Sequence, residues 1–280
     1  MSLKLAALIV MAGVATAQTA YQREIAQWRA DRETKLKAEN GWLTVVGLNW
    51  LREGENRVGS DPNFEVPLPA SAPQRVGTIT LTNGKVHFKP ASGIPLKETD
   101  LKPDTAPDYD KLSLGRLMFY AIERENKFAI RVKDNDSEAR KTFTGLRWYP
   151  VDASWKIKAK FIPSPHSVTF DTEVGVKEKD ESPGYVTFVR RGQEYRLEPV
   201  KEDDELFFVI RDQTSGKTTY AASRFLYSAL PKNGFVELDF NKAENPPCVF
   251  TDFATCPLPP PQNRMKLAVT AGEQTYGNHR

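Results

Sequence analysis

The sequence predicts a mostly β protein, an antiparallel β-sandwich or barrel-like architecture with one N-terminal amphipathic helix. From Asn40 onward, short segments of alternating apolar and polar residues are separated by turn residues. An Asn-Gly pair at 83–84 joins two such segments and is the strongest short-range signal of a hairpin. A single segment, 19–39, has the apolar spacing of a long helix.

Residues 1–17, MSLKLAALIVMAGVATA, have the pattern of a secretory signal peptide. Lys4 precedes a short apolar run, and Ala15-Thr16-Ala17 places small residues at the positions that signal peptidase requires, so we expect cleavage before Gln18. The run is too short to cross a bilayer, which needs about 20 residues. The alternative is a buried N-terminal helix. We expect an exported protein, periplasmic or extracellular, with no membrane insertion after cleavage.

The helix predicted over 19–39 places Tyr21, Ile25, Trp28 and Leu36 near one face, with charged residues around the rest. Such a helix usually packs on a sheet. A partner-binding or membrane-surface role is the alternative, and the mixed charges of its polar face argue against membrane adsorption.

Proline and glycine separate the predicted strands, with breaks at Pro163, Pro165, Pro183 and Pro231. The charged run 177–181 has the composition of a solvated loop. We expect one mostly β domain over 18–280, or two β subdomains with a seam near 95–113, which is polar and contains proline. The predicted strands are 44–51, 57–60, 77–82, 85–90, 115–125, 127–134, 155–162, 166–174, 184–192, 194–201, 205–212, 218–230 and 234–240.

The formal charge of the chain is +3, and acidic and basic residues alternate along it. Nucleic-acid binding needs a clustered basic face, so this charge pattern argues against a nucleic-acid partner. The chain also has no Gly-rich phosphate loop, GxGxxG, G-x-S-x-G or H-E-x-x-H motif. We expect no cofactor, and the catalytic residues, if there are any, stay unknown.

Cys248 and Cys256 are the two cysteines of the chain, and in an exported protein such a pair is most simply a disulfide. A zinc site would need about four soft ligands. The three histidines, His87, His166 and His279, are far apart in the sequence, so we expect no metal. A reactive thiolate is the remaining alternative, although it needs a basic neighbour.

Polar residues are frequent between 212 and 263, and this stretch contains the candidate ligand-binding residues. Tyr220 and Arg224 share one face of a strand and suit an anionic or sugar-like ligand, or else Arg224 forms a buried salt bridge with Asp239. Buried asparagines can instead satisfy loop amides. A carboxylate pair of Asp239 with Asp212 or Glu237 would suffice for glycoside hydrolysis. The candidates are Tyr220, Arg224, Asp239, Asn241, Asn245 and Asn263.

Four blocks, GWLTVVGLNWLREGENRVGSDP, RKTFTGLRWYP, DQTSGKTTYAASRFLY and LDFNKAENPPCVFTDFATCPLPPPQNR, resemble the bacterial domain-of-unknown-function family 1684. The resemblance extends from about Tyr21 to Glu273 and implies no assigned activity. One departure is Glu244, where the family pattern often has an aromatic residue. A second, local resemblance is that of EGENRVGSDPNFEVPLP, 53–69, to the opening of a forkhead-associated domain. Ser60 stands where such domains have their phosphothreonine-binding arginine, so the resemblance implies a β-sandwich shape alone.

These observations leave three hypotheses. The first is an exported, non-catalytic protein that binds a small polar or glycan-like ligand, or a protein partner, through a polar patch beside the Cys248–Cys256 loop. The second is a cofactor-free hydrolase that uses carboxylates or Cys248 in the same patch. The third is a purely structural envelope protein, which would have neither a pocket nor an exposed aromatic patch.

Overall fold

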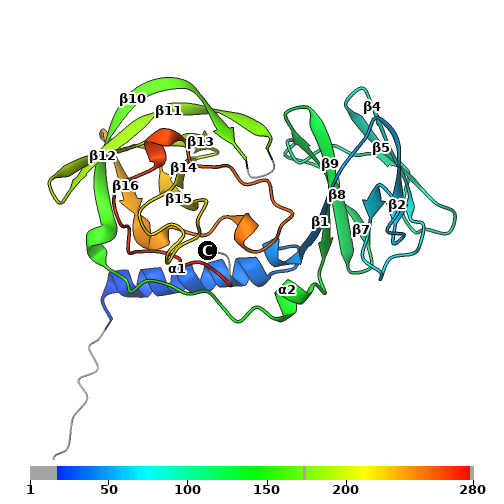
Figure 1. Cartoon of the computed structure of the whole chain (residues 1–280), viewed down its shortest axis with the longest axis horizontal. Helices are drawn as coiled ribbons and strands as arrows, with labels where there is room; N and C mark the ends of the chain where they lie inside the picture. The colour runs from blue at the N-terminus through cyan, green and yellow to red at the C-terminus, as the bar shows by residue number, and fades with distance from the viewer. Residues whose placement is uncertain (1–17, 173–174, 278–280) are drawn as a thin grey trace, which may run out of the picture.

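The computed structural model describes residues 18–172 and 175–277. The predicted signal peptide, 1–17, lies outside the described residues. The chain is mostly β, with antiparallel sheets and one long N-terminal helix, so the predicted fold class is confirmed. Figure 1 shows two β lobes side by side, with the helix along the base of the second lobe.

Helix α1 spans Ala20–Lys37 and begins at a capping box. The side chain of Thr19 accepts a hydrogen bond from the backbone N–H of Gln22, whose side chain accepts one from the N–H of Thr19, so two free helix N–H groups are satisfied. Ile25 and Leu36 are buried on the inner face, and the ring of Trp28 meets that of Trp148 edge-on at 5.7 Å. The helix therefore packs onto the protein, as its apolar spacing predicts.

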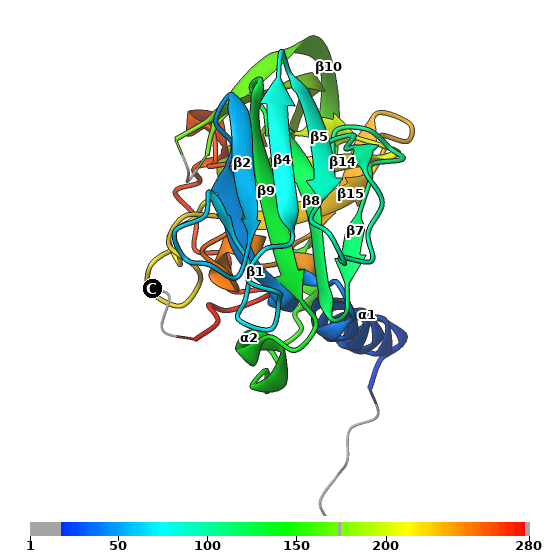
Figure 2. The same cartoon turned by 90° about the vertical axis from the view of Figure 1, so that its right-hand side faces the viewer.

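The first lobe is built from two sheets that face each other (Figure 2). One sheet has the order β1-β9-β8-β7 and the other the order β3-β2-β4-β5-β6. Side chains from both sheets, among them Ile79, Phe88, Phe119 and Ile130, are fully buried between them. The strands are β1 (Val45–Trp50), β2 (Gly54–Gly59), β3 (Val66–Pro67), β4 (Gly77–Thr82), β5 (Lys85–Pro90), β6 (Thr99–Asp100), β7 (Leu112–Leu114), β8 (Leu117–Arg124) and β9 (Lys127–Asp134).

The hairpin predicted from Asn83-Gly84 is confirmed. It joins β4 to β5, and both turn residues have positive φ, 49° and 77°. The tight turns that match the twist of a hairpin need this conformation at both positions, and asparagine and glycine adopt it most readily.

The predicted seam near 95–113 does not separate the lobes. Leu101 and Leu112 from this segment are buried in the core of the first lobe, and β6 pairs with β5. The chain instead passes from the first lobe to the second after β9, through helix α2 (Glu138–Lys141) and an extended segment. A polar, proline-bearing segment resembles a linker in sequence, but here its few apolar residues fill the core.

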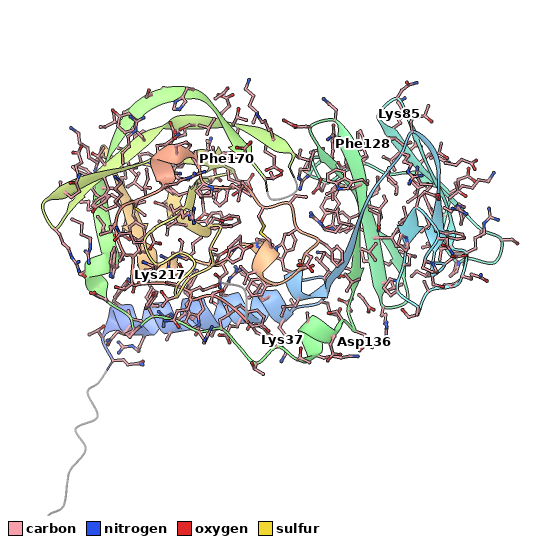
Figure 3. The ribbon with its side chains drawn as sticks, in the orientation of Figure 1. Lys37, Lys85, Phe128, Asp136, Phe170 and Lys217 are labelled. Carbon is pink, nitrogen blue, oxygen red and sulfur yellow. A yellow bond between two sulfur atoms is a disulfide. The ribbon has the colours of Figure 1, made fainter. Side chains whose placement is uncertain are left out.

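The second lobe holds a sheet with the order β12-β11-β10-β16 and a smaller sheet with the order β13-β14-β15. Its core contains Leu197, Phe208, Leu226, Leu238 and Phe240, each fully buried. Figure 3 labels one core side chain of each lobe, Phe128 and Phe170. The strands are β10 (Lys156–Asp171), β11 (Lys177–Arg190), β12 (Gln193–Leu197), β13 (Val200–Glu202), β14 (Glu205–Ile210), β15 (Arg224–Ala229) and β16 (Phe235–Asp239).

Two sequence predictions fail in the β10–β11 hairpin. The expected break at Pro163 and Pro165 is an irregularity within one long strand, because the pairing of β10 with β11 shifts between Pro163 and His166 and then resumes. The break expected at Pro183 likewise falls inside β11. The run 177–181, predicted to be a solvated loop, is the first part of β11. Pairing with β10 satisfies its backbone, and the hairpin arches toward the first lobe (Figure 1).

Short 3-10 helices mark the remaining turns: η1 (Trp42–Thr44), η2 (Ala153–Trp155), η3 (Phe240–Lys242), η4 (Pro247–Val249) and η5 (Pro261–Asn263). Cys248, in η4, and Cys256 form a disulfide, with their Cα atoms 6.3 Å apart, and both are almost fully buried. Within the described residues, no helix has the length and apolar character that crossing a membrane requires.

Replacing both cysteines, C248S/C256S, should lower the free energy of unfolding by roughly 2.5 kcal/mol, because the disulfide closes a short loop in the unfolded chain. Urea denaturation of the variant and of the wild type measures this difference. Wild-type protein unfolded with reductant should match the variant. Alkylation of two thiols in the untreated wild-type protein would contradict the disulfide.

Candidate functional site

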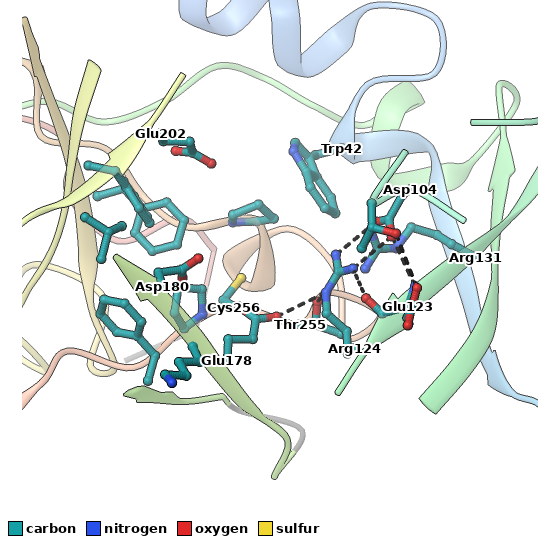
Figure 4. A pocket seen from close by; sticks show the side chains of 18 of the residues that line it. Trp42, Asp104, Glu123, Arg124, Arg131, Glu178, Asp180, Glu202, Thr255 and Cys256 are labelled. Atoms are coloured by element: carbon teal, nitrogen blue, oxygen red, sulfur yellow. Dashed lines mark hydrogen bonds and ion pairs between the residues drawn. The ribbon is translucent and has the colours of Figure 1, made fainter. Parts of the chain in front are cut away.

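A cleft of about 1120 Å³ lies between the two lobes and is the candidate site. Strands β8 and β9 and the segment before β7 form one wall, and β11, β13 and the end of β15 form the other. Thr255, Cys256 and Pro257, from the disulfide loop, lie between the walls, as Figure 4 shows for Thr255 and Cys256. The cleft therefore joins residues that are far apart in the sequence.

The first-lobe wall carries two cations, Arg131 and Lys133, on β9. They are two residues apart on a strand, so both side chains project from the same face. The guanidinium of Arg131 lies 5.2 Å from the ring centroid of Trp42, and the side chain of Arg131 is only 3% exposed. Its Nε and Nη2 atoms have no hydrogen-bond partner among the described residues. Burying a guanidinium without a full set of partners costs folding free energy, so Arg131 could still accept an anionic partner.

Lys133 donates a hydrogen bond to the backbone carbonyl of Asn40 at 2.5 Å. Burial, together with the nearby charges of Arg131 and Lys111, lowers the pKa of Lys133 to about 8. Burial also raises the pKa of the Tyr120 hydroxyl, which Arg131 partly offsets. The lowered pKa of Lys133 therefore reflects burial first and the neighbouring positive charges second.

Arg124, at the end of β8, connects the two lobes across the cleft. Its Nη1 and Nη2 atoms bind both carboxylate oxygens of Asp104, at 2.8 and 3.0 Å. Its Nε atom lies 3.1 Å from the carboxylate of Glu178 on β11 and donates to the hydroxyl of Thr255 at 3.3 Å. Figure 4 shows these interactions as dashed lines. Asp104 and Glu178 are thus already paired with Arg124.

The second-lobe wall carries three carboxyls next to three lysines, Lys177, Lys179 and Lys201. Glu178 and Asp180 lie on β11 and Glu202 on β13, opposite Arg131 in Figure 4. Burial is the largest cause that raises the pKa of each of these three carboxyls. The pKa of the nearby Tyr227 hydroxyl is raised mainly by burial and next by Glu202. Carboxylate oxygens accept hydrogen bonds, which suits a ligand rich in hydroxyl groups.

Glu244 completes the lining and is held by strand pairing and by α1. Its backbone exchanges hydrogen bonds with Phe225 at 2.8 and 2.9 Å. Its carboxylate lies 3.3 Å from Arg32 Nε, which also binds the buried Glu273 at 3.0 Å. Burial raises the pKa of Glu244 to about 7, against the opposing effect of Arg32 and with a contribution from Glu273. A carboxyl with this pKa exists in both protonation states near neutral pH.

The structure gives Arg224 and Asp239 internal partners. Arg224 is 1% exposed, pairs with Asp212 at 2.7 Å and donates to the carbonyls of Val269 and Ala271. A buried salt bridge of Arg224 was predicted as the alternative, but its partner is Asp212 and not the predicted Asp239. Asp239 instead accepts a hydrogen bond from the hydroxyl of Tyr21 at 2.8 Å. Asp212 is thus already paired with Arg224, and the carboxylate pair of Asp239 with Asp212 or Glu237 stays a prediction.

The three candidate asparagines are buried and tie the backbone together. Asn241 donates to the carbonyl of Asp152 and to the hydroxyl of Tyr21. Asn245 donates to the carbonyl of Gln274, and Asn263 joins the backbone of Glu198 to that of β14. This is the role of satisfying loop amides that the sequence left open as the alternative.

Tyr220 packs against the apolar residues around the disulfide loop. None of the six sequence-predicted ligand residues lines the cleft. Sequence analysis did not identify Arg131 as a site residue. A charged residue inside the apolar run FAIRV of β9 was the signal that could have indicated it. The carboxyls of the opposite wall had no such signal, because 177–181 resembles an ordinary charged loop.

In the part of the chain that the structure describes, no group of three or more His, Cys, Asp or Glu side chains is placed to hold a metal ion.

Residues 141–274 match the family model described as "Protein of unknown function (DUF1684)". The resemblance to this family is thus supported over the second lobe. The solution NMR structure of an uncharacterized protein of Haloarcula marismortui is 30% identical, with a TM-score of 0.40; the match covers 49% of this chain and 79% of that one. No curated protein matches the chain.

Stability should fall as the pH rises from about 4.5 to about 7, because Glu244 holds its proton more tightly in the folded state. The substitution E244Q should remove about 2–3 kcal/mol of this fall, since glutamine does not titrate. Denaturant unfolding at pH 4.5, 6 and 8 measures the effect. E194Q, at an exposed glutamate on β12, is the matched control and should keep the wild-type profile. An unchanged profile for E244Q would contradict the raised pKa.

Proposed function

We propose that this protein is an exported, non-catalytic binding protein that holds a small polar or glycan-like ligand in the interlobe cleft. The observation that carries the proposal is the composition of the cleft: charged side chains of both signs, together with aromatic rings including Trp42, Tyr109 and Tyr227. Aromatic rings pack against the apolar faces of sugars, and flanking charged groups bind hydroxyl groups. Binding clefts combine these two kinds of surface.

The position of the disulfide loop also favours the interlobe cleft as the ligand site. Thr255, Cys256 and Pro257 of this loop line the cleft, although the six residues of the predicted polar patch do not. The disulfide and the neighbouring prolines reduce the freedom of the loop before binding, which lowers the entropy cost of holding a ligand.

Export is part of the proposal, and two observations support it. The cap of α1 uses residues after the predicted cleavage point: Gln18 accepts a hydrogen bond from Arg23 at 2.5 Å, and Thr19 forms the capping box. Removal of 1–17 would therefore leave the cap complete. A disulfide is also stable in an oxidising compartment.

Hydrolysis without a cofactor is the second candidate function, and Glu244 favours it. A general acid works best when its pKa lies near the operating pH, and burial brings the pKa of Glu244 to about 7. Cys248 is not available as a nucleophile in this structure because it is disulfide-bonded. A purely structural envelope protein would have no need of a charged cleft.

The forkhead-associated resemblance of 53–69 stays a prediction about shape. We propose no phosphothreonine binding there, because Arg57 forms two hydrogen bonds of 2.9 Å with the carboxylate of Glu65.

Filling the cleft should abolish ligand binding. We expect E202W to place a bulky ring in the cleft, whereas K217W, on an exposed turn outside it, is the matched control. Titration with a panel of neutral and acidic mono- and oligosaccharides, followed by tryptophan fluorescence or calorimetry, should give saturable binding to the wild type and K217W, and at least about tenfold weaker binding to E202W. Equal affinity of all three proteins would place the ligand elsewhere.

The same titrations separate the two candidate functions. A non-catalytic protein releases its bound saccharides unchanged, whereas a hydrolase releases a reducing sugar, with a rate that falls in E244Q. Chromatography of the recovered ligand decides between them.

The N-terminus of protein purified from the periplasm or the medium should be Gln18. Intact-mass measurement of protein expressed with its native leader tests this. Recovery of the full-length chain from the cytoplasm alone would contradict export.

A further inference from the structure

We infer that Arg131 and Lys133 form an anion-binding subsite, which receives a carboxylate or phosphate group of the ligand held in the cleft. This inference deepens the proposed function and rests on it, because it names the chemical class of the ligand. It starts from a side chain that the fold leaves incompletely paired.

The guanidinium of Arg131 has been removed from water without a counter-ion. The side chain is 3% exposed. Among the described residues, its Nε and Nη2 atoms have no hydrogen-bond partner and no carboxylate forms an ion pair with it. Buried charges are normally paired, so a missing partner at the wall of a cleft points to a group supplied by a ligand.

The nearby carboxylates cannot fill this role because Arg124 already uses them. Asp104 is bound through both oxygens, and Glu178 through one. Arg124 is thus a fully paired cation in the same cleft, in contrast to Arg131. Arg131 differs from it in having two buried nitrogens without a hydrogen-bond partner and no carboxylate partner among the described residues.

Lys133 adds a second cation on the same face of β9. Its amino group is 5.6 Å from the ring centroid of Tyr120 and 6.0 Å from that of Trp42, and among the described residues it forms no salt bridge. An arginine beside a lysine supplies both a planar fork and a point charge, a combination that recognises carboxylate and phosphate oxygens.

The two walls together describe the ligand. Arg131 and Lys133 on the first-lobe wall would hold the anionic group, while the carboxyls of the second-lobe wall would accept hydrogen bonds from hydroxyl groups. Trp42 lies beside the cations and offers an apolar ring surface. An acidic or phosphorylated sugar fits this arrangement better than a neutral one.

Nitrogen NMR of arginine side chains tests the subsite directly in protein produced from the full chain. Inorganic phosphate, added at constant ionic strength, should shift the Nε–H signal of Arg131 in a saturable way. The Nε–H signal of Arg124, already bound to Glu178 and Thr255, is the internal control and should move less. Absence of a saturable shift at Arg131 would overturn the inference, and this measurement needs no variant that could fail to fold.

Matched ligand pairs then identify the anion. Calorimetry with galactose, galacturonate and galactose 6-phosphate should show at least about tenfold tighter binding of one or both anionic sugars than of galactose. R131M should remove this preference, whereas K217M, at an exposed lysine on a turn outside the cleft, should keep it. Preference for galacturonate alone indicates a carboxylate, and preference for the phosphorylated sugar alone indicates a phosphate.

The outcomes separate this inference from the proposed function. Equal binding of galactose and both anionic sugars would overturn the anion subsite and leave the binding function standing. A phosphate shift at Arg131 with no binding of any sugar would support the subsite and reject a glycan-like ligand. If neither phosphate nor any sugar of the panel binds, both proposals fail.

Discussion

The contact that holds the two lobes around the cleft is the set of interactions made by Arg124. One side chain binds Asp104 in its own lobe, Glu178 on the β10–β11 hairpin of the other lobe, and Thr255 in the disulfide loop. A guanidinium can do this because it presents five donors in a fixed plane. Removing it would leave two partly buried carboxylates without a partner, which costs more than the lost attraction alone.

The pairing of Arg124 determines which charged groups of the cleft remain without an ion-pair partner among the described residues. Arg124 pairs with the carboxylates closest to it, and among the described residues Arg131 and Lys133 on β9 have no carboxylate partner. The opposite wall gathers carboxyls whose burial favours the protonated form. The site therefore combines two cations on β9 with carboxyls on the opposite wall. The way in which the two lobes meet sets the distance between these two groups.

The border of the cleft at Glu244 depends on α1, which contributes Arg32. Arg32 reaches from the helix to Glu244 and Glu273 and donates to the carbonyl of Asn245 at 2.9 Å. Through these contacts the helix fixes the segment that leads into the disulfide loop. The loop in turn places Thr255 next to Arg124, so the helix, the disulfide and the interlobe contact support one another.

The sequence by itself determined the local structure: the amphipathic spacing of α1, the Asn83-Gly84 hairpin, the β-rich class and the cysteine pair. These follow from interactions between residues that are close along the chain. The site was decided by the tertiary structure, because Arg131, Glu178, Glu244 and Thr255 come together only when two lobes and a C-terminal loop pack. The sequence also suggested ligand residues that the structure does not place in the cleft: Arg224, Asn241, Asn245 and Asn263. These side chains form hydrogen bonds within the protein, with partners that are distant in the sequence. A buried polar side chain and a binding side chain have the same appearance in a sequence, and only packing shows whether the protein itself supplies the hydrogen-bond partner.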